Sequence, residues 1–171
     1  RQRCAAAPNA ARPAGRRAAA RHRTAAGGEG FCDHPVWIGG FVARLDPRSY
    51  TSRECLKLLG GRLWKEPEGN GILTAAYLAG VPIFCPAIAD SSIGMGLSQG
   101  RHKSPGAGQI DIIGDIIESA NIVIRRPRTA TIVLGGGTPK NFMNQASVQA
   151  EFFSDAVSGH RYALQIVTDV P

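Results

Sequence analysis

Three consecutive glycines, Gly135 to Gly137, are the residues whose type and position most directly indicate ligand binding. They lie between a β-prone run, Thr129 to Leu134, and a segment that can begin a helix at Pro139. Glycines let a ligand approach the backbone, and the first N–H groups of a helix are free to bind an anion. The spacing is not G-x-G-x-x-G, so the motif alone fits a phosphate-binding loop and a ligand-free tight turn equally well.

An acidic residue in a second loop could complete a dinucleotide site. Asp90 follows the apolar segment Val81–Cys85 and begins the run Asp-Ser-Ser-Ile-Gly. A carboxylate placed after a strand can accept the hydroxyl groups of a ribose. The competing interpretation is that Asp90 or Ser91 caps a helix, which capping preferences favour. If both loops follow parallel strands, Asp90 and Gly136 should lie in one cleft at the carboxyl edge of the sheet.

Other residues with catalytic potential are isolated in the sequence. No histidine has a partner at metal-ligand spacing, so we predict solvated or loop positions and no metal for His22, His34, His102 and His160. The cysteines lack C-x-x-C spacing, which excludes a zinc site and a dense disulfide framework and favours a reducing, cytoplasmic setting: Cys4, Cys32, Cys55 and Cys85. A basic cluster is predicted to lie at a helix C-terminus, where the dipole favours cations: Arg125, Arg126 and Arg128.

Helices are needed to position these loops, and local patterns predict several. Thr51 and Glu54 have capping-box spacing, which predicts a helix over Ser52–Leu59 with Gly60-Gly61 as its stop. A helix end is predicted over Leu73–Leu78. From Ile110 to Ile124, apolar residues recur on one predicted helix face: Ile113, Ile116, Ile117, Ala120 and Val123.

Three apolar runs are predicted to be buried strands: Val81–Cys85, Thr129–Leu134 and Tyr162–Val167. Small and polar residues predict loops over Pro86–Gly100 and Gln99–Gln109. Strands that are buried on both faces and alternate with helices indicate an α/β fold, with a Rossmann-like parallel sheet and flanking helices. The uncharged run Ile72–Ala89 is long enough to span a membrane, but Gly80, Pro82 and Pro86 divide it, so we predict no span.

The net charge of +7 is concentrated at one end of the chain. Residues 1–24 contain seven arginines and no acid, while the other 13 basic residues balance all 13 acidic ones. We predict a disordered tail over residues 1–30 and leave residues 31–48 unassigned. The tail lacks interleaved aromatic residues, which argues against nucleic-acid binding. Because the sequence starts at Arg1 and not at methionine, we expect a truncated or out-of-frame product.

Four sequence blocks, taken together and in order, resemble the deoxyhypusine synthase family, and its bacterial homospermidine synthase branch most closely. They are Asn70-Gly-Ile-Leu-Thr-Ala-Ala-Tyr, Val81-Pro-Ile-Phe-Cys-Pro-Ala-Ile, Asp90-Ser-Ser-Ile-Gly and Ile132-Val-Leu-Gly-Gly-Gly-Thr-Pro-Lys-Asn. The resemblance covers about residues 49–171 and implies a partial NAD-binding domain. Any single block would be unspecific, but their ordered spacing is not.

The resemblance implies a transferase that uses NAD to move the aminobutyl group of spermidine to an acceptor amine. The acceptor would be putrescine in the bacterial branch or a protein lysine in eukaryotes. It also implies a homotetramer, with neither nucleic acid nor membrane as a partner. The alternative is a non-catalytic nucleotide-binding or assembly module.

Site residues follow from the same resemblance. Asp90, Gly135, Gly136, Gly137 and Thr168 correspond to cofactor-binding positions of the family. Asn141 stands where eukaryotic members have a substrate-contacting histidine, and Met95 replaces a polyamine-binding aspartate.

The family's nucleophile is a lysine in a Trp-Gly-Lys segment that follows the strand ending near Asp169. This chain ends at Pro171, and none of its lysines has that context: Lys57, Lys65, Lys103 and Lys140. We therefore expect no catalytic residue in the chain and no transferase activity from it alone.

Overall fold

The computed structural model describes residues 29–66, 71–157 and 159–168. The predicted tail lies outside this part, except for its last two residues, which begin a helix. The elements in chain order are α1 (Glu29–Val42), β1 (Ser49–Tyr50), α2 (Ser52–Leu63), α3 (Ile72–Ala79), the 3-10 helix η1 (Ile88–Asp90), α4 (Ser92–Lys103), β2 (Gln109–Ile110), α5 (Ile112–Ile124), β3 (Ala130–Leu134), α6 (Thr138–Phe153) and β4 (Tyr162–Ile166). In the described part of the chain, no helix has the length and apolar character needed to cross a membrane.

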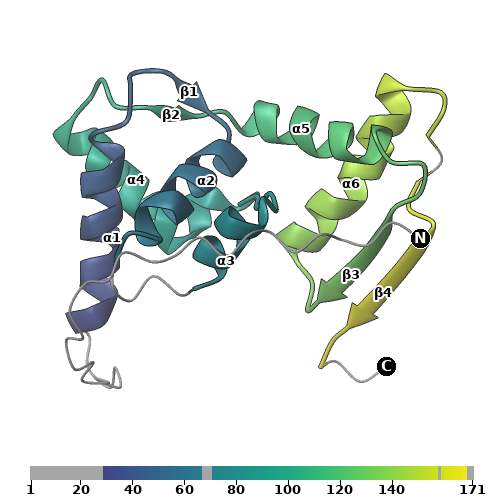
Figure 1. Ribbon diagram of the computed structural model, residues 1–171, viewed down its shortest axis with the longest axis horizontal. Coiled ribbons are helices and arrows are strands. Elements are labelled where there is room, and N and C mark those ends of the chain that lie inside the picture. Colours follow the sequence, from purple (N-terminus) through teal and green to yellow (C-terminus); the bar gives the residue numbers. More distant parts are fainter. Residues whose placement is uncertain (1–28, 67–70, 158, 169–171) are drawn as a thin grey trace.

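The helices pack in pairs, and these pairs follow one another across the molecule (Figure 1). Helix α1 packs on α4 at one end, α2 packs on α3 in the middle, and α5 leads to α6 and the strands β3 and β4 at the other end. The short strands β1 and β2 pair in parallel, with Ser49 opposite Gln109. The chain is therefore a mixed helix and strand structure, as an α/β assignment requires.

The α1–α4 pair was not predicted, because its glycines resemble those of loops. A Cβ atom on Gly100 would lie 2.7 Å from the carbonyl oxygen of Gly39, so the two helices touch backbone to backbone. Residues 31–48 and the predicted loops over 86–109 thus contain most of two packed helices. Their apolar cluster consists of Ile38, Val42 and Ala107, with Trp37, Phe41, Leu45, Ile93 and Leu97 packed around them.

Helix α2 begins as predicted but does not stop at Gly60-Gly61. The N–H of Glu54 donates to Thr51 Oγ1 at 3.2 Å, which confirms the cap. The helix then runs to Leu63, because its two glycines face α3 and permit close packing there. A Cβ atom on Gly60 would lie 2.6 Å from the Leu73 carbonyl oxygen. Helix α3 confirms the predicted helix end and terminates at Gly80, whose φ of 66° is left-handed.

The prediction that Val81–Cys85 is a buried strand is wrong. The segment forms no ladder with any other described residue, and Val81 is 57% exposed. Its ends are held by other means: the N–H of Val81 donates to the Ala76 carbonyl, and that of Cys85 donates to Ser52 Oγ. Pro82 has no N–H to contribute to a ladder.

The carboxyl-terminal part is a parallel βαβ unit, as predicted. Strand β3 pairs with β4 from Ala130 opposite Tyr162 to Leu134 opposite Ile166, and α6 connects them. These strands are not buried on both faces: β3 alternates between buried and exposed residues, and every residue of β4 is exposed. In this part of the chain the sheet has two strands, so the three-stranded Rossmann-like arrangement is not formed by the described residues.

Helix α5 confirms the predicted helix, but only part of its apolar face is buried. Ala120 and Val123 are buried against Ala146 and Ala150 of α6. Ile113 and Ile117, which belong to the same predicted apolar face, are 65% and 45% exposed. The spacing of apolar residues predicts helix α5, but it does not indicate that α6 covers only the second half of that helix.

Candidate functional site

A hollow of about 350 Å³ lies where the glycine loop, the start of α6 and the end of β4 meet. Its position at the carboxyl ends of two parallel strands is typical of ligand sites in α/β proteins. The lining residues are Gly135, Gly136, Gly137, Lys140, Asn141, Gln165, Val167 and Thr168.

The three glycines keep this hollow open. Gly135 and Gly137 have φ angles of 87° and 74°, in the left-handed region that other residues rarely adopt. A Cβ atom on either would meet nothing within 4 Å, and one on Gly136 would meet only Gln165 Nε2, at 3.8 Å. The loop therefore exposes bare backbone to the hollow: two of its glycines have a left-handed backbone, and all three have open space where a side chain would lie.

Hydrogen bonds from two side chains hold the glycine loop in position. Gln165 Nε2 donates to the Gly135 carbonyl at 2.9 Å, and Lys140 Nζ donates to Gln165 Oε1 at 2.6 Å. The N–H of Gly135 donates to the Ile166 carbonyl at 2.8 Å, continuing the ladder. Sequence reasoning missed both Lys140 and Gln165. Two signals were available: a cation in the first turn after the glycines, and one polar residue within an apolar strand.

The electrostatics of the hollow favour an anion. Helix α6 has no side-chain cap at its N-terminus, and its first turn offers N–H groups together with the Lys140 ammonium group. Among the residues that the structure describes, none that lines the hollow carries a carboxylate. A phosphate group suits this environment, whereas a polyamine cation does not.

Five of the six predicted site residues line this one hollow. Gly135, Gly136, Gly137, Asn141 and Thr168 come together there. Asp90 does not line it; this residue is exposed at the end of η1. Its cofactor role and the shared cleft stay predictions.

Ser91, the neighbour of Asp90, confirms the capping interpretation. Ser91 Oγ accepts from the N–H of Gly94 at 3.0 Å and caps α4. Met95, which replaces a polyamine-binding aspartate of the family, lies on the same helix and is 44% exposed.

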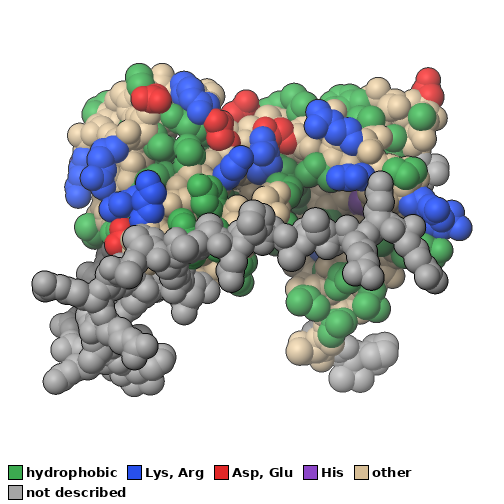
Figure 2. Space-filling model, in the orientation of Figure 1, with side chains coloured by type: hydrophobic (Ala, Val, Ile, Leu, Met, Phe, Trp, Pro, Cys, Tyr) green, Lys and Arg blue, Asp and Glu red, His purple; other side chains and the backbone are tan. Residues whose placement is uncertain are grey.

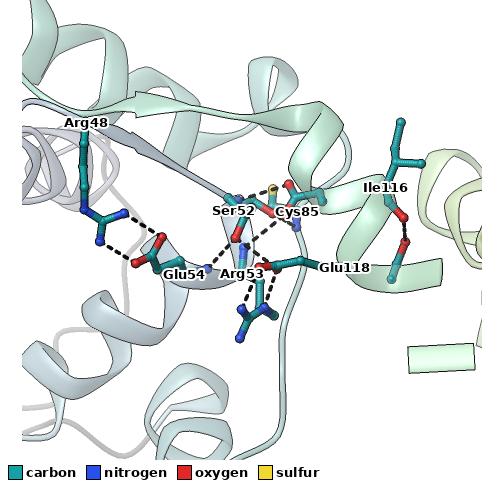
Figure 3. A network of polar contacts seen from close by, with 10 residues as sticks. Arg48, Ser52, Arg53, Glu54, Cys85, Ile116 and Glu118 are labelled. Carbon is teal, nitrogen blue, oxygen red and sulfur yellow. Dashed lines mark hydrogen bonds and ion pairs between the residues drawn. The ribbon is translucent and has the colours of Figure 1, made fainter. Parts of the chain in front are cut away.

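A separate polar network joins α2 to α5 (Figure 3). Asp115 is 1% exposed, and its carboxylate accepts from the N–H groups of Ser52, at 3.1 Å, and Arg53, at 3.3 Å. It therefore caps α2 from a distant helix. Because both oxygens have donors, the network serves to fix the two helices relative to each other.

Glu118 completes this network as an ionised carboxylate that is hydrogen-bonded to Arg53 and Thr51. Arg53 Nη2 donates to Glu118 Oε1 at 2.7 Å, and Thr51 Oγ1 donates to Oε2 at 3.1 Å. The hydrogen bond from Arg53 lowers the pKa of Glu118, against the opposing effect of burial.

Burial raises the pKa of the Cys55 thiol to about 11, so this thiol stays protonated at neutral pH and is no nucleophile.

His160 and Arg125 have structural positions. His160 lies in a loop, as predicted, but it is not simply solvated: Nδ1 contacts Thr129 Oγ1 at 2.8 Å and Nε2 contacts the Met143 carbonyl at 3.1 Å. It thereby ties the start of the βαβ unit to α6. Arg125 is the C-cap residue of α5, which confirms its predicted place at a helix terminus.

Comparisons with known proteins agree with the sequence blocks. Residues 24–171 match the deoxyhypusine synthase family, so the match begins earlier than the blocks from about residue 49 suggested. A probable deoxyhypusine synthase 2 of Archaeoglobus fulgidus is 46% identical over 71% of this chain and 39% of its own length. A deoxyhypusine synthase-like protein of Coxiella burnetii is 40% identical over 81% of this chain and 40% of its own length. The chain thus spans about two fifths of the length of these relatives.

Proposed function

Because the chain belongs to the deoxyhypusine synthase family, we propose that it serves the NAD-dependent transfer of the aminobutyl group of spermidine to an acceptor amine. The acceptor is putrescine or a protein lysine. NAD, when bound, supplies the hydride acceptor for oxidation of the amine. The residues of this chain supply the binding surface for that cofactor.

The observation that carries the proposal is the open glycine loop beside an uncapped helix N-terminus. Bare backbone at Gly135–Gly137, free N–H groups of α6 and the Lys140 ammonium suit a phosphate-bearing cofactor. We assign cofactor contacts to the loop and to Thr168, and a further contact to Asp90.

Substrate binding would involve Asn141, whose amide oxygen can accept from an ammonium group. It lines the hollow beside Lys140, whose positive charge would repel a polyamine placed against it. The carboxylate that pairs with the polyamine therefore comes from outside the described residues that line the hollow. We propose that the amine meets the site at Asn141 and extends away from Lys140.

We also propose that none of this chain's four lysines carries the aminobutyl group. Imine formation requires a neutral amine, which a desolvated pocket favours. Lys57, Lys65 and Lys103 are exposed, and Lys140 is bonded to Gln165. Incubation with spermidine and NAD, followed by borohydride trapping and mass spectrometry, should give no adduct. An adduct on any of the four would contradict this assignment.

The cofactor site is tested by the variant Gly136→Val. Gly136 does not have a positive φ, so the variant adds a side chain to the loop without forcing a left-handed backbone. We expect NAD affinity, measured by calorimetry, to fall about tenfold or more, since the close approach is blocked. Gly106→Val is the matched control, because Gly106 also has open space and no positive φ. Equal NAD affinity in the wild type and Gly136→Val would reject the site.

The second candidate function is a nucleotide-binding or assembly module without catalysis. Apolar side chains that remain exposed on β3 and β4 favour it, and hydrophobic residues are visible at the surface over the carboxyl ends of these strands (Figure 2). The transferase and the non-catalytic module differ in whether NADH is formed from spermidine and NAD. Under the first, a longer relative with the same loop forms NADH from spermidine and NAD, and Gly136→Val reduces that rate. Under the second, NAD binds and copies associate, but no NADH forms.

A further inference from the structure

A second hollow, of about 340 Å³, shares no residue with the glycine loop site. It lies between α2, α3, α5 and the extended segment after α3, and its size is within the range of small-molecule sites. The lining residues are Arg53, Leu56, Lys57, Leu73, Ala76, Tyr77, Gly80, Val81, Pro82, Ile83, Glu118, Asn121, Ile122 and Arg125.

Part of the wall of this hollow is apolar, and its side chains are held in place by packing. The ring of Tyr77 contacts the backbone of α2, since a Cβ atom on Gly61 would lie 2.8 Å from Tyr77 Cε2. Ile83 and Ile122 contribute aliphatic surface from two other elements. Because these groups come from separate elements packed on one another, the apolar walls exist before any ligand arrives.

The charged side chains around the hollow do not balance. Arg53 and Glu118 neutralise each other in a bidentate pair. Lys57 and Arg125 also line it, and within residues 29–66, 71–157 and 159–168 neither side chain has a hydrogen-bond or ion-pair partner. Both side chains are exposed, so the two unpaired cations give the rim of the hollow a net positive charge that attracts an anion.

We propose that this hollow binds a small organic anion: a carboxylate or phosphate group attached to an apolar body. Lys57 and Arg125 bind the charged group, and the apolar wall formed by Tyr77, Ile83 and Ile122 covers the body. Asn121 offers a neutral hydrogen-bonding group beside them. The site does not depend on the glycine loop, and its positive charge excludes spermidine as its ligand.

Octanoate and octyl phosphate are suitable probes, with octylamine as the cationic counterpart. Each is titrated into the ¹⁵N-labelled full chain, and amide chemical shifts are recorded by NMR. We expect saturable shifts in α3 and in the second half of α5 with the two anions but not with octylamine. The anion that binds with the higher affinity identifies the preferred headgroup, carboxylate or phosphate.

The double variant Lys57→Gln with Arg125→Gln should weaken binding of the preferred anion about tenfold or more, since two charge-assisted interactions are lost. The matched control, Lys103→Gln with Arg128→Gln, changes two exposed cations that do not line the hollow and should change the affinity less than twofold. Circular dichroism confirms that both variants fold.

Three results would overturn the proposal: equal affinity in the two double variants, equal binding of octylamine, or shifts confined to β3 and β4. Absence of any saturable binding to the wild type would do the same. None of these results bears on NAD binding at the glycine loop, which Gly136→Val tests separately.

Discussion

Glycine has opposite roles in the helical part of the molecule, residues 29–124, and in the βαβ unit, residues 130–166. At the helix crossings, a Cβ atom on Gly100 or Gly60 would lie within 2.7 Å of a carbonyl oxygen on the neighbouring helix. In the loop after β3, a Cβ atom on Gly135 or Gly137 would meet nothing within 4 Å. The first group allows contact between helices, and the second leaves open space beside the loop. A glycine is thus informative about function only when its surroundings are known.

The largest effect that this comparison predicts is at Gly100. Valine there would force α1 away from α4, and we expect a loss of about 3 kcal/mol in the free energy of unfolding. Urea denaturation followed by circular dichroism measures it. Gly106→Val, in open space between α4 and β2, should cost less than about 1 kcal/mol. Similar losses for the two variants would mean that the glycines of α4 are not contact residues.

The same distinction explains what the sequence could and could not predict about the fold. The βαβ unit was predicted because its signals are local: a β-prone run, three glycines, a helix with proline in its first turn and a second β-prone run. Helices α1 and α4 depend on a contact between Gly39 and Gly100, which are distant in sequence. Local propensity treats such glycines as breakers, so α4 was mistaken for loop.

The strand prediction at Val81–Cys85 failed for a related reason. β-branched and aromatic residues indicate that a segment can pair, but pairing also requires a neighbouring strand. In the described residues the segment contacts helices, and Cys85 is bonded to Ser52. For the site, the glycine loop was predictable from adjacent residues. The supporting pair Lys140 and Gln165 was not, because its hydrogen bond joins helix α6 to strand β4, 25 positions apart in the sequence.

The next largest loss of stability is expected at Asp115, which caps a helix distant in sequence. It is compared with Asp111, which caps its own helix. Asp115→Ala removes the acceptor for two N–H groups at the start of α2, so we expect a loss of about 2 to 3 kcal/mol in unfolding free energy. Asp111 caps α5 through the nearby N–H of Gly114 at 2.8 Å and is exposed. Asp111→Ala should cost about 1 kcal/mol. Urea denaturation of both variants tests this order, and a reversed order would contradict the assignment.

Glu118 is expected to have a smaller effect that depends on pH. Its pKa is lowered by Arg53, so its ionised form stabilises the fold at neutral pH. This stabilisation is present above the ordinary carboxyl pKa and is lost as the pH falls through the lowered pKa. Glu118→Gln should therefore cost about 1 kcal/mol at neutral pH, and this cost should shrink as the pH falls through the lowered pKa of Glu118. Glu151→Gln, at an exposed carboxylate of α6, is the control and should change the unfolding free energy at neutral pH by less than about 0.5 kcal/mol.

The smallest expected effect is on the outer face of β3, and it tests whether that face is open. Ile132 is 66% exposed, whereas its neighbour Val133 is 9% exposed and faces the opposite side of the strand. Ile132→Thr keeps a β-branched side chain and its strand preference but removes apolar surface. If water already covers the face, unfolding free energy should change by less than about 0.5 kcal/mol.

Val133→Thr is the matched control, because it places a hydroxyl group on the buried side of the same strand. It should cost about 1 to 2 kcal/mol, since that hydroxyl lacks the partner that burial demands. Both values come from urea denaturation at two protein concentrations. A loss at Ile132 as large as that at Val133 would show that the outer face is covered in solution. If that loss also grew with concentration, the cover would be a second copy of the chain, and the βαβ unit would be as fully packed as the helical part.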